Sequence, residues 1–158
     1  MNMAQELPIM ESFLTIQGEG YHSGKPAFFI RTGGCDVGCA WCDVKESWEA
    51  ENHPLQNITA LQKLSLENES EWVVLTGGEP AMYTLNPLVG KLKEINRSVA
   101  IETSGCYALD APVDWYTFSP KKFKKPCAEA YDKADELKIV IYHKSDFRWA
   151  LKHAAKVN

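Results

Sequence analysis

The sequence predicts an α/β fold with a mostly parallel sheet. Short apolar runs rich in β-branched and aromatic residues alternate along the chain with runs of helical periodicity. Turn residues bound each apolar run, and such near-continuous apolar runs are typical of strands buried on both faces of a sheet. Strands and helices that alternate in this way are joined by right-handed crossovers, so the strands lie parallel.

Five strands and three helices are expected from these patterns. The strands are predicted at residues 27–32, 72–76, 98–103, 115–119 and 137–142. A helix over 86–96 has Pro87 at its start, with apolar residues at helical spacing behind it. Further helices are predicted over 57–68 and over 145–157, the last one capped by Ser145 or Asp146.

Four of the predicted strands end in unusual short sequences. "GGC" follows the first strand, "GGEP" the second, "SG" the third and "PKK" the fourth. The carboxyl ends of parallel strands meet at one edge of a sheet, where ligands bind in α/β proteins. The sequence therefore predicts a single site at this edge.

Length and composition limit the class of protein. A chain of 158 residues with no internal repeat or low-complexity linker fits one domain over residues 1–158. The net charge of −4 disfavours a nucleic-acid partner, and the basic run at 121–125 is interpreted as a solvated loop around Lys121. No apolar run approaches the roughly 20 residues that span a bilayer. No export signal is visible at the N-terminus, and crowded cysteines fit a reducing compartment, so we expect a cytoplasmic protein.

The stretch "GGCDVGCAWCD" places Cys35, Cys39 and Cys42 in a C-x3-C-x2-C spacing. Thiolates are soft ligands that suit zinc or an iron–sulfur cluster. A structural zinc site takes four protein ligands, but no fourth candidate repeats a paired spacing. A four-iron cluster held by three thiolates leaves one iron open, so an open cluster is the preferred interpretation.

These cysteines and the motifs around them resemble the radical S-adenosylmethionine (SAM) enzymes. Trp41 holds the aromatic position before the last cysteine, and "TGGEP" at 76–80, which alone would suggest an ordinary turn, resembles the family's segment for SAM's amino group. Three further motifs are "TIQGEG" at 15–20, "ETSG" at 102–105 and "SPK" at 119–121. Together with the cysteine and "TGGEP" motifs, they resemble the 7-carboxy-7-deazaguanine synthase family in their order along the chain. The resemblance runs from about Ile9 to Tyr142.

The resemblance implies a trimmed, partial TIM-like radical SAM barrel, and a homodimeric lyase. It implies conversion of 6-carboxy-5,6,7,8-tetrahydropterin into 7-carboxy-7-deazaguanine with loss of ammonia, in queuosine precursor biosynthesis. The implied cofactors are a [4Fe–4S] cluster and SAM, with an electron donor such as a flavodoxin.

Site residues follow from the matching motifs. Gln17 has amide donors and an acceptor that suit a pterin edge, and Arg31 can bind a carboxylate through two parallel hydrogen bonds. The cluster ligands implied are Cys35, Cys39 and Cys42. The implied SAM contacts are Trp41, Cys42, Asp43, Gly78, Glu79, Glu102, Ser119, Pro120 and Lys121. The implied substrate contacts are Ile16, Gln17, Gly18, Arg31 and Thr76.

Two departures from the family pattern stand out. A threonine or serine commonly follows the C-x3-C-x2-C-D motif and ligates magnesium, but Val44 holds that position and has no ligand atom. A magnesium ion (Mg2+) is therefore disfavoured here. The family also continues past the last helix to a segment that helps close the substrate pocket, and we expect this chain to lack that segment.

Two alternatives remain at the level of sequence. The first is another small radical SAM enzyme, such as an activase that installs a glycyl radical on a partner protein. The second is a non-catalytic zinc or iron–sulfur binding module. "TIQGEG" together with "ETSG" argues against the activase.

Overall fold

A computed structural model describes residues 5–157 and contains a single seven-stranded sheet. The strand order is β3-β1-β2-β4-β5-β6-β7, and β2, β4, β5, β6 and β7 run parallel, while β1 is antiparallel to both of its neighbours. The strands are β1 (Glu6–Ile16), β2 (Pro26–Thr32), β3 (Leu55–Asn57), β4 (Trp72–Gly77), β5 (Ser98–Thr103), β6 (Trp115–Phe118) and β7 (Glu136–Leu137). The predicted fold class is confirmed.

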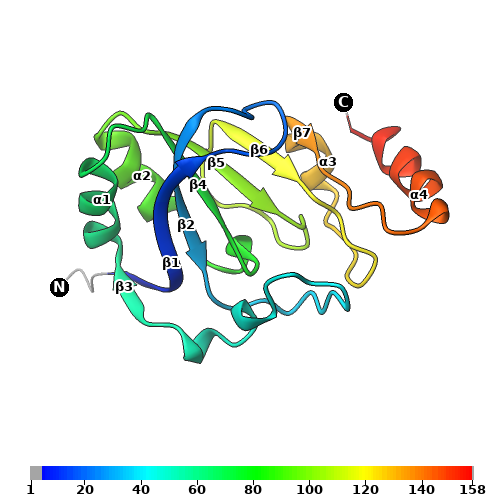
Figure 1. Cartoon of the computed structure of the whole chain (residues 1–158), viewed down its shortest axis with the longest axis horizontal. Helices are drawn as coiled ribbons and strands as arrows, with labels where there is room; N and C mark the ends of the chain where they lie inside the picture. The colour runs from blue at the N-terminus through cyan, green and yellow to red at the C-terminus, as the bar shows by residue number, and fades with distance from the viewer. Residues whose placement is uncertain (1–4, 158) are drawn as a thin grey trace.

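Four α-helices accompany the sheet. They are α1 (Ile58–Leu66), α2 (Asn86–Glu94), α3 (Glu129–Lys133) and α4 (Lys144–Ala154), with 3-10 turns at Lys45–Ser47, Ala50–Asn52 and Pro80–Met82. Figure 1 shows α1 and α2 together at one end of the molecule, and α4 at the opposite end, beyond β7 and α3. None of the helices in residues 5–157 has the length and apolar character that a membrane crossing requires.

The two faces of the sheet have different cores. On one face, α1 and α2 cover Ile30, Leu75 and Ile101 together with their same-face neighbours. On the other face lies a small cluster built around Ala27, Phe29, Val74 and Ala100. Alternation along each strand places these two sets on opposite sides. The small alanine side chains leave room on the second face for the segment that connects β1 to β2.

That connecting segment folds against the amino ends of the parallel strands. The Tyr21 ring stacks on Trp115 at a centroid distance of 5.0 Å, and the His22 ring lies 4.2 Å from the Trp72 ring. The backbone N–H of Tyr21 donates to the Glu136 carboxylate at 2.8 Å. These contacts fix the loop that carries the "QGEG" motif over the second face of the sheet.

Most predicted elements are confirmed, with one clear error among the strands. The strand predicted over 137–142 is wrong beyond Leu137, because β6 ends at Phe118 and offers no further partner. Val140, Ile141 and Tyr142 are 45%, 40% and 84% exposed instead of buried. The long antiparallel strand β1 and the short elements β3 and α3 were not predicted.

The cap of the last helix also differs from the prediction. His143 is the N-cap of α4, and Asp146 is the third helical residue of a capping box. The Asp146 carboxylate accepts from the backbone N–H groups of Tyr142 and His143 at 2.9 and 2.8 Å. A carboxylate at this position satisfies N–H groups that have no partner within the helix.

Candidate active site

Two adjoining cavities open at the carboxyl ends of the parallel strands. The first, here called the cysteine cavity, has a volume of about 250 Å³ and is lined by residues that include Cys35, Cys39 and Cys42. The second, here called the hairpin cavity, has a volume of about 380 Å³ and lies beside the β1–β2 hairpin. The wall between them is shared by Glu19, Asp43, Thr76, Gly77, Glu102 and Lys138.

The cysteine loop is held in shape by its neighbours. Gly34 and Gly38 have φ values of 92° and 72°, which side chains rarely tolerate. The Gly34 N–H donates to the Ser47 carbonyl at 2.6 Å, and the Cys35 N–H donates to the Trp48 carbonyl at 3.1 Å. The left-handed backbone at these two positions lets the loop turn sharply around the cysteines.

The three cysteines form a donor set that fits an iron–sulfur cluster. All three are free, and all three line one cavity. Burial raises the pKa of Cys39 to about 11 and also raises the pKa of Cys35, and a cation bound beside these thiols would favour their thiolate form. Within residues 5–157, no three His, Cys, Asp or Glu side chains are grouped closely enough to hold a single metal ion. Cluster thiolates bind separate irons, so a cluster requires no such group.

An ion pair ties the cysteine loop to the opposite side of the cavity. Asp36, between the first two cysteines, accepts from Lys124 Nζ at 2.5 Å and from the Tyr107 hydroxyl. Hydrogen bonds from Lys124 and Tyr107 lower the pKa of Asp36 below its usual range. Lys122 pairs with Asp146, so the basic run at 121–125 is not simply solvated.

The glycines of "TGGEP" have protein atoms as their nearest neighbours. A Cβ on Gly78 would lie 2.1 Å from the Gly34 carbonyl oxygen, and one on Gly77 would lie 2.4 Å from the Thr32 backbone. The Gly78 N–H donates to the Thr32 carbonyl at 2.8 Å. These contacts bring the ends of β4 and β2 close together.

Glu79 is a buried residue that lines the cysteine cavity and holds neighbouring segments together. It is 1% exposed, and its carboxylate accepts from the Ala81 N–H at 3.1 Å, the Ser104 N–H at 2.8 Å and the hydroxyls of Thr103 and Ser104. These bonds join the loop after β4 to the end of β5. Its predicted contact with SAM stays a prediction.

The loop after β6 places Lys121 on the cysteine cavity. The Lys121 ammonium donates to the Ser119 carbonyl at 2.9 Å and to the Ser119 hydroxyl, and it lies 5.8 Å from the Trp41 ring centroid. Burial lowers the pKa of Lys121. Pro120 is buried between these two residues and lines neither cavity. Of the predicted SAM contacts, the remaining eight line the cysteine cavity: Trp41, Cys42, Asp43, Gly78, Glu79, Glu102, Ser119 and Lys121.

All five predicted substrate contacts line the hairpin cavity. They are Ile16, Gln17, Gly18, Arg31 and Thr76, and Val44 lines the same cavity. The Gln17 side-chain amide donates to Glu102 Oε1 at 3.1 Å, and its oxygen accepts from the Glu19 N–H at 3.2 Å. The amide orientation is thereby set before any ligand binds.

Arg31 combines a structural contact with exposure to the cavity. Its Nε lies 3.3 Å from Glu11 Oε1 on the adjacent strand β1, and its guanidinium lies 5.8 Å from the Phe13 ring centroid. Among the described residues, its buried Nε makes no hydrogen bond that meets normal geometry. A guanidinium fork on a cavity wall suits a carboxylate ligand.

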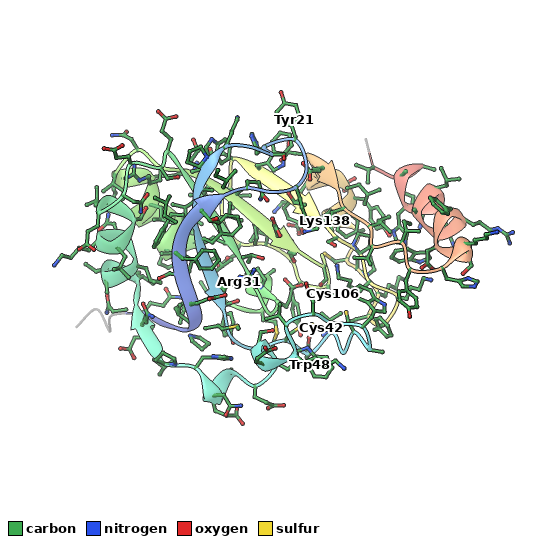
Figure 2. All side chains as sticks on the ribbon, in the orientation of Figure 1. Tyr21, Arg31, Cys42, Trp48, Cys106 and Lys138 are labelled. Carbon is green, nitrogen blue, oxygen red and sulfur yellow. The ribbon has the colours of Figure 1, made fainter. Side chains whose placement is uncertain are left out.

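Lys138 is the principal site residue that the sequence interpretation missed. It lines both cavities and forms ion pairs with Glu19 and Glu102. Figure 2 labels it to the right of Arg31 and above Cys42. A lysine inside the apolar run "LKIVIY" was the available signal, because a charge within a buried strand needs partners.

Known proteins of similar sequence cover most of this chain. A 7-carboxy-7-deazaguanine synthase of Flavobacterium psychrophilum is 53% identical over 155 residues, which span 96% of this chain and 72% of that protein. The Synechocystis sp. protein of the same name is 47% identical over 151 residues, which span 96% of this chain and 73% of that protein. The Escherichia coli protein of that name is 37% identical over 160 residues, which span 84% of this chain and 71% of that protein. No family model matches the chain.

A solved structure also matches. The crystal structure of QueE from Escherichia coli superposes with a TM-score of 0.89 at 32% sequence identity, covering 97% of this chain and 78% of that one. The match confirms the partial barrel that the sequence predicts. With more than half of its residues identical to one relative and its fold shared with another, the chain belongs to the 7-carboxy-7-deazaguanine synthase family of radical SAM lyases.

Proposed function

We propose that this chain converts 6-carboxy-5,6,7,8-tetrahydropterin into 7-carboxy-7-deazaguanine, with loss of ammonia and regeneration of SAM. The activity for which the relatives are named supports this reaction in queuosine precursor biosynthesis. The observation that carries the proposal is the pair of adjoining cavities. One is lined by the three cysteines and the other by all five predicted substrate contacts, and they share one wall.

In the cysteine cavity, Cys35, Cys39 and Cys42 would hold a [4Fe–4S] cluster, and the residues around them would hold SAM. Reductive cleavage of SAM is the chemistry that the bound cluster supplies. The chain's own contribution there is placement. Lys121, with its ammonium held by Ser119, offers a fixed positive charge for a carboxylate of SAM.

In the hairpin cavity, Gln17 and Arg31 would orient the pterin. The Gln17 amide keeps one N–H and one oxygen lone pair beyond those used by Glu102 and Glu19. This donor–acceptor pair complements the cyclic amide edge of a pterin. The Arg31 fork would bind the substrate carboxylate, so that two separate contacts fix the ring relative to the shared wall.

Further features of the working enzyme belong to the same proposal. The three-cysteine site requires a one-electron donor, for which a flavodoxin is proposed, and the active form is proposed to be a homodimer in the cytoplasm. Residues 1–158 are proposed to form one core domain, since a single sheet connects all described elements. Because Val44 offers only methyl groups to the hairpin cavity, turnover is proposed to proceed without magnesium.

The test is anaerobic reconstitution of the protein with iron and sulfide. The loaded protein is then incubated with SAM, a reductant and carboxytetrahydropterin, and deazaguanine product is measured by mass spectrometry. A Cys39→Ala variant provides the matched control. SAM cleavage with an unaltered pterin would refute the substrate, and isolation with zinc but without labile sulfide would refute the cluster.

A further inference from the structure

We propose that Lys138 is a positioning residue for substrate binding. Its ammonium fixes the Glu102 carboxylate and, through it, the Gln17 amide, in the orientation that receives the pterin. This inference deepens the proposed function and rests on it.

Lys138 reaches the shared wall from the edge of the sheet. Its backbone N–H donates to the Phe118 carbonyl at 2.8 Å, which continues the β6–β7 pairing one residue past β7. This bond fixes the Cα of Lys138 beside the end of β6. Its side chain, 32% exposed, then lies on the wall that separates the cysteine cavity from the hairpin cavity.

Three residues of this wall, Glu19, Glu102 and Lys138, form a closed ring of interactions with Gln17 of the hairpin cavity. Lys138 Nζ pairs with the Glu19 carboxylate and lies 3.4 Å from Glu102 Oε2. The other oxygen of Glu102, Oε1, accepts from Gln17 Nε2 at 3.1 Å. Gln17 Oε1 accepts in turn from the Glu19 N–H at 3.2 Å. The ring joins the β1–β2 connection, the end of β5 and the residue after β7.

The charge of Lys138 is what allows this ring to exist. Glu19 and Glu102 are two carboxylates that line one wall and pair with the same ammonium, and their like charges repel each other. An ammonium between them offsets the repulsion. Glu102 is the more buried of the two, with 20% of its side chain exposed against 64% for Glu19, so it depends more on this partner.

The orientation of the Gln17 amide follows from the charge on Glu102. An ionised carboxylate accepts hydrogen bonds and cannot donate, so the NH2 end of Gln17 must face Glu102. The remaining N–H and the remaining lone pair then point in a fixed order along the hairpin cavity. If Glu102 moves, the Gln17 amide loses its acceptor and can rotate by half a turn, presenting donor and acceptor in the reverse order, which a pterin edge does not match.

The experiment compares Lys138→Met with Lys93→Met. Lys93 is a matched control, because it also pairs with a carboxylate, Asp114, at 2.7 Å, and its side chain is 35% exposed. The Kd for carboxytetrahydropterin is measured by fluorescence titration of the reconstituted, SAM-loaded protein without reductant. KM, kcat and the ratio of 5′-deoxyadenosine to deazaguanine are then measured with reductant.

The expected result is a loss of pterin affinity without a loss of SAM cleavage. Lys138→Met should raise both Kd and KM by about tenfold, the equivalent of one lost charged hydrogen bond. It should also release more 5′-deoxyadenosine per deazaguanine formed, because SAM that is cleaved without a positioned pterin is not regenerated. Lys138→Arg should recover most of the affinity, and Lys93→Met should leave every value unchanged. In a Glu102→Gln background, Lys138→Met should add little further loss, because the two residues act in series.

Three results would overturn the proposal. They are an unchanged Kd in Lys138→Met, an equal loss in Lys93→Met, or a fully additive loss in the Glu102→Gln background. If Lys138→Met does not fold by circular dichroism, Lys138→Gln takes its place. Failure of the unmodified protein to make deazaguanine would refute the proposed function instead, and the titration would still decide the role of Lys138 in pterin binding.

Discussion

Strand β5 and the segment around β7 have similar sequences but different structures. β5 is the apolar run "SVAIET", whereas β7 contains only the first residue of the apolar run "LKIVIY", and each run has a single embedded charge. β5 is a six-residue strand paired with β4 on one side and β6 on the other. β7 pairs only with β6, and for only two residues. The difference teaches that an apolar run becomes a buried strand only where neighbours exist to satisfy its backbone.

The two sides of the site differ in the same way, because one is formed by central strands and the other by the edge of the sheet. On the central side, formed by β2, β4 and β5, backbone contacts such as Gly78 against Gly34 and buried bonds such as those of Glu79 fix the geometry. On the edge side, formed by β6, β7 and the chain beyond, Lys138 and Lys124 reach the site through long side chains and ion pairs. We therefore expect substitutions on the central side to have the larger effects.

The largest effect is expected at the cysteines, where Cys39 on the central side is compared with Cys127 at the edge. Cys39→Ala, in the loop after β2, should abolish the iron–sulfur absorption and all SAM cleavage, because a cluster cannot keep its open iron after losing one of three ligands. Cys127→Ala, beside α3 at the edge, should preserve both, since the Cys127 thiol donates to the Gly105 carbonyl and lies outside both cavities. The ultraviolet–visible spectrum and 5′-deoxyadenosine release measure the two outcomes. Loss of the cluster in Cys127→Ala would remove the distinction between the sides.

The next largest difference in activity is expected between substitutions of Arg31 on β2 and Arg148 on α4. Arg31→Ala on β2 should lower kcat/KM for the pterin roughly a hundredfold, because a bidentate charged contact is worth a few kcal/mol. Arg31→Lys should recover only part of it, since an ammonium cannot reproduce the fork. Arg148→Ala on the exposed surface of α4 is the control and should be neutral. SAM cleavage lost in equal measure would assign Arg31 to the cluster or to folding.

Two isoleucines, one in β5 and one beyond β7, allow the stability of the two segments to be compared. Ile101 in β5 is fully buried, and Ile141 beyond β7 is 40% exposed. Ile101→Ala should lower the free energy of unfolding by about 2–5 kcal/mol through a cavity in the core. Ile141→Ala should change it by less than about 0.5 kcal/mol. Urea denaturation of both variants measures the difference, and similar losses would mean that the segment after β7 is packed more tightly than the structure shows.

The smallest effect is expected at Val44. Magnesium prefers oxygen ligands, and valine supplies none, so turnover should respond little to added magnesium or to a chelator that spares the cluster. Val44→Thr should introduce a magnesium response if the remaining pocket is intact. The comparison requires rates of both proteins over a magnesium titration. Strong activation of the unmodified protein would show that the hydroxyl is dispensable.

The sequence by itself determined the strands of the central sheet and the positions of the key motifs. Apolar runs fixed β2, β4 and β5 because these strands are buried on both faces, where local pattern and tertiary environment agree. Motif spacing likewise placed the cysteine loop and "TGGEP" at one edge of the sheet. The resemblance to a known family supplied the substrate contacts, and all five of them line one cavity.

Only the tertiary structure decided what happens at the edge of the sheet. The length of β7 depends on where β6 ends, which no residue in 137–142 encodes. His143, and not the expected Ser145 or Asp146, is the N-cap of α4. The Asp146 carboxylate accepts from the backbone N–H of His143 instead. The ring of Lys138, Glu102, Gln17 and Glu19 joins residues more than a hundred positions apart, so its partners could be identified only once the sheet had brought them together.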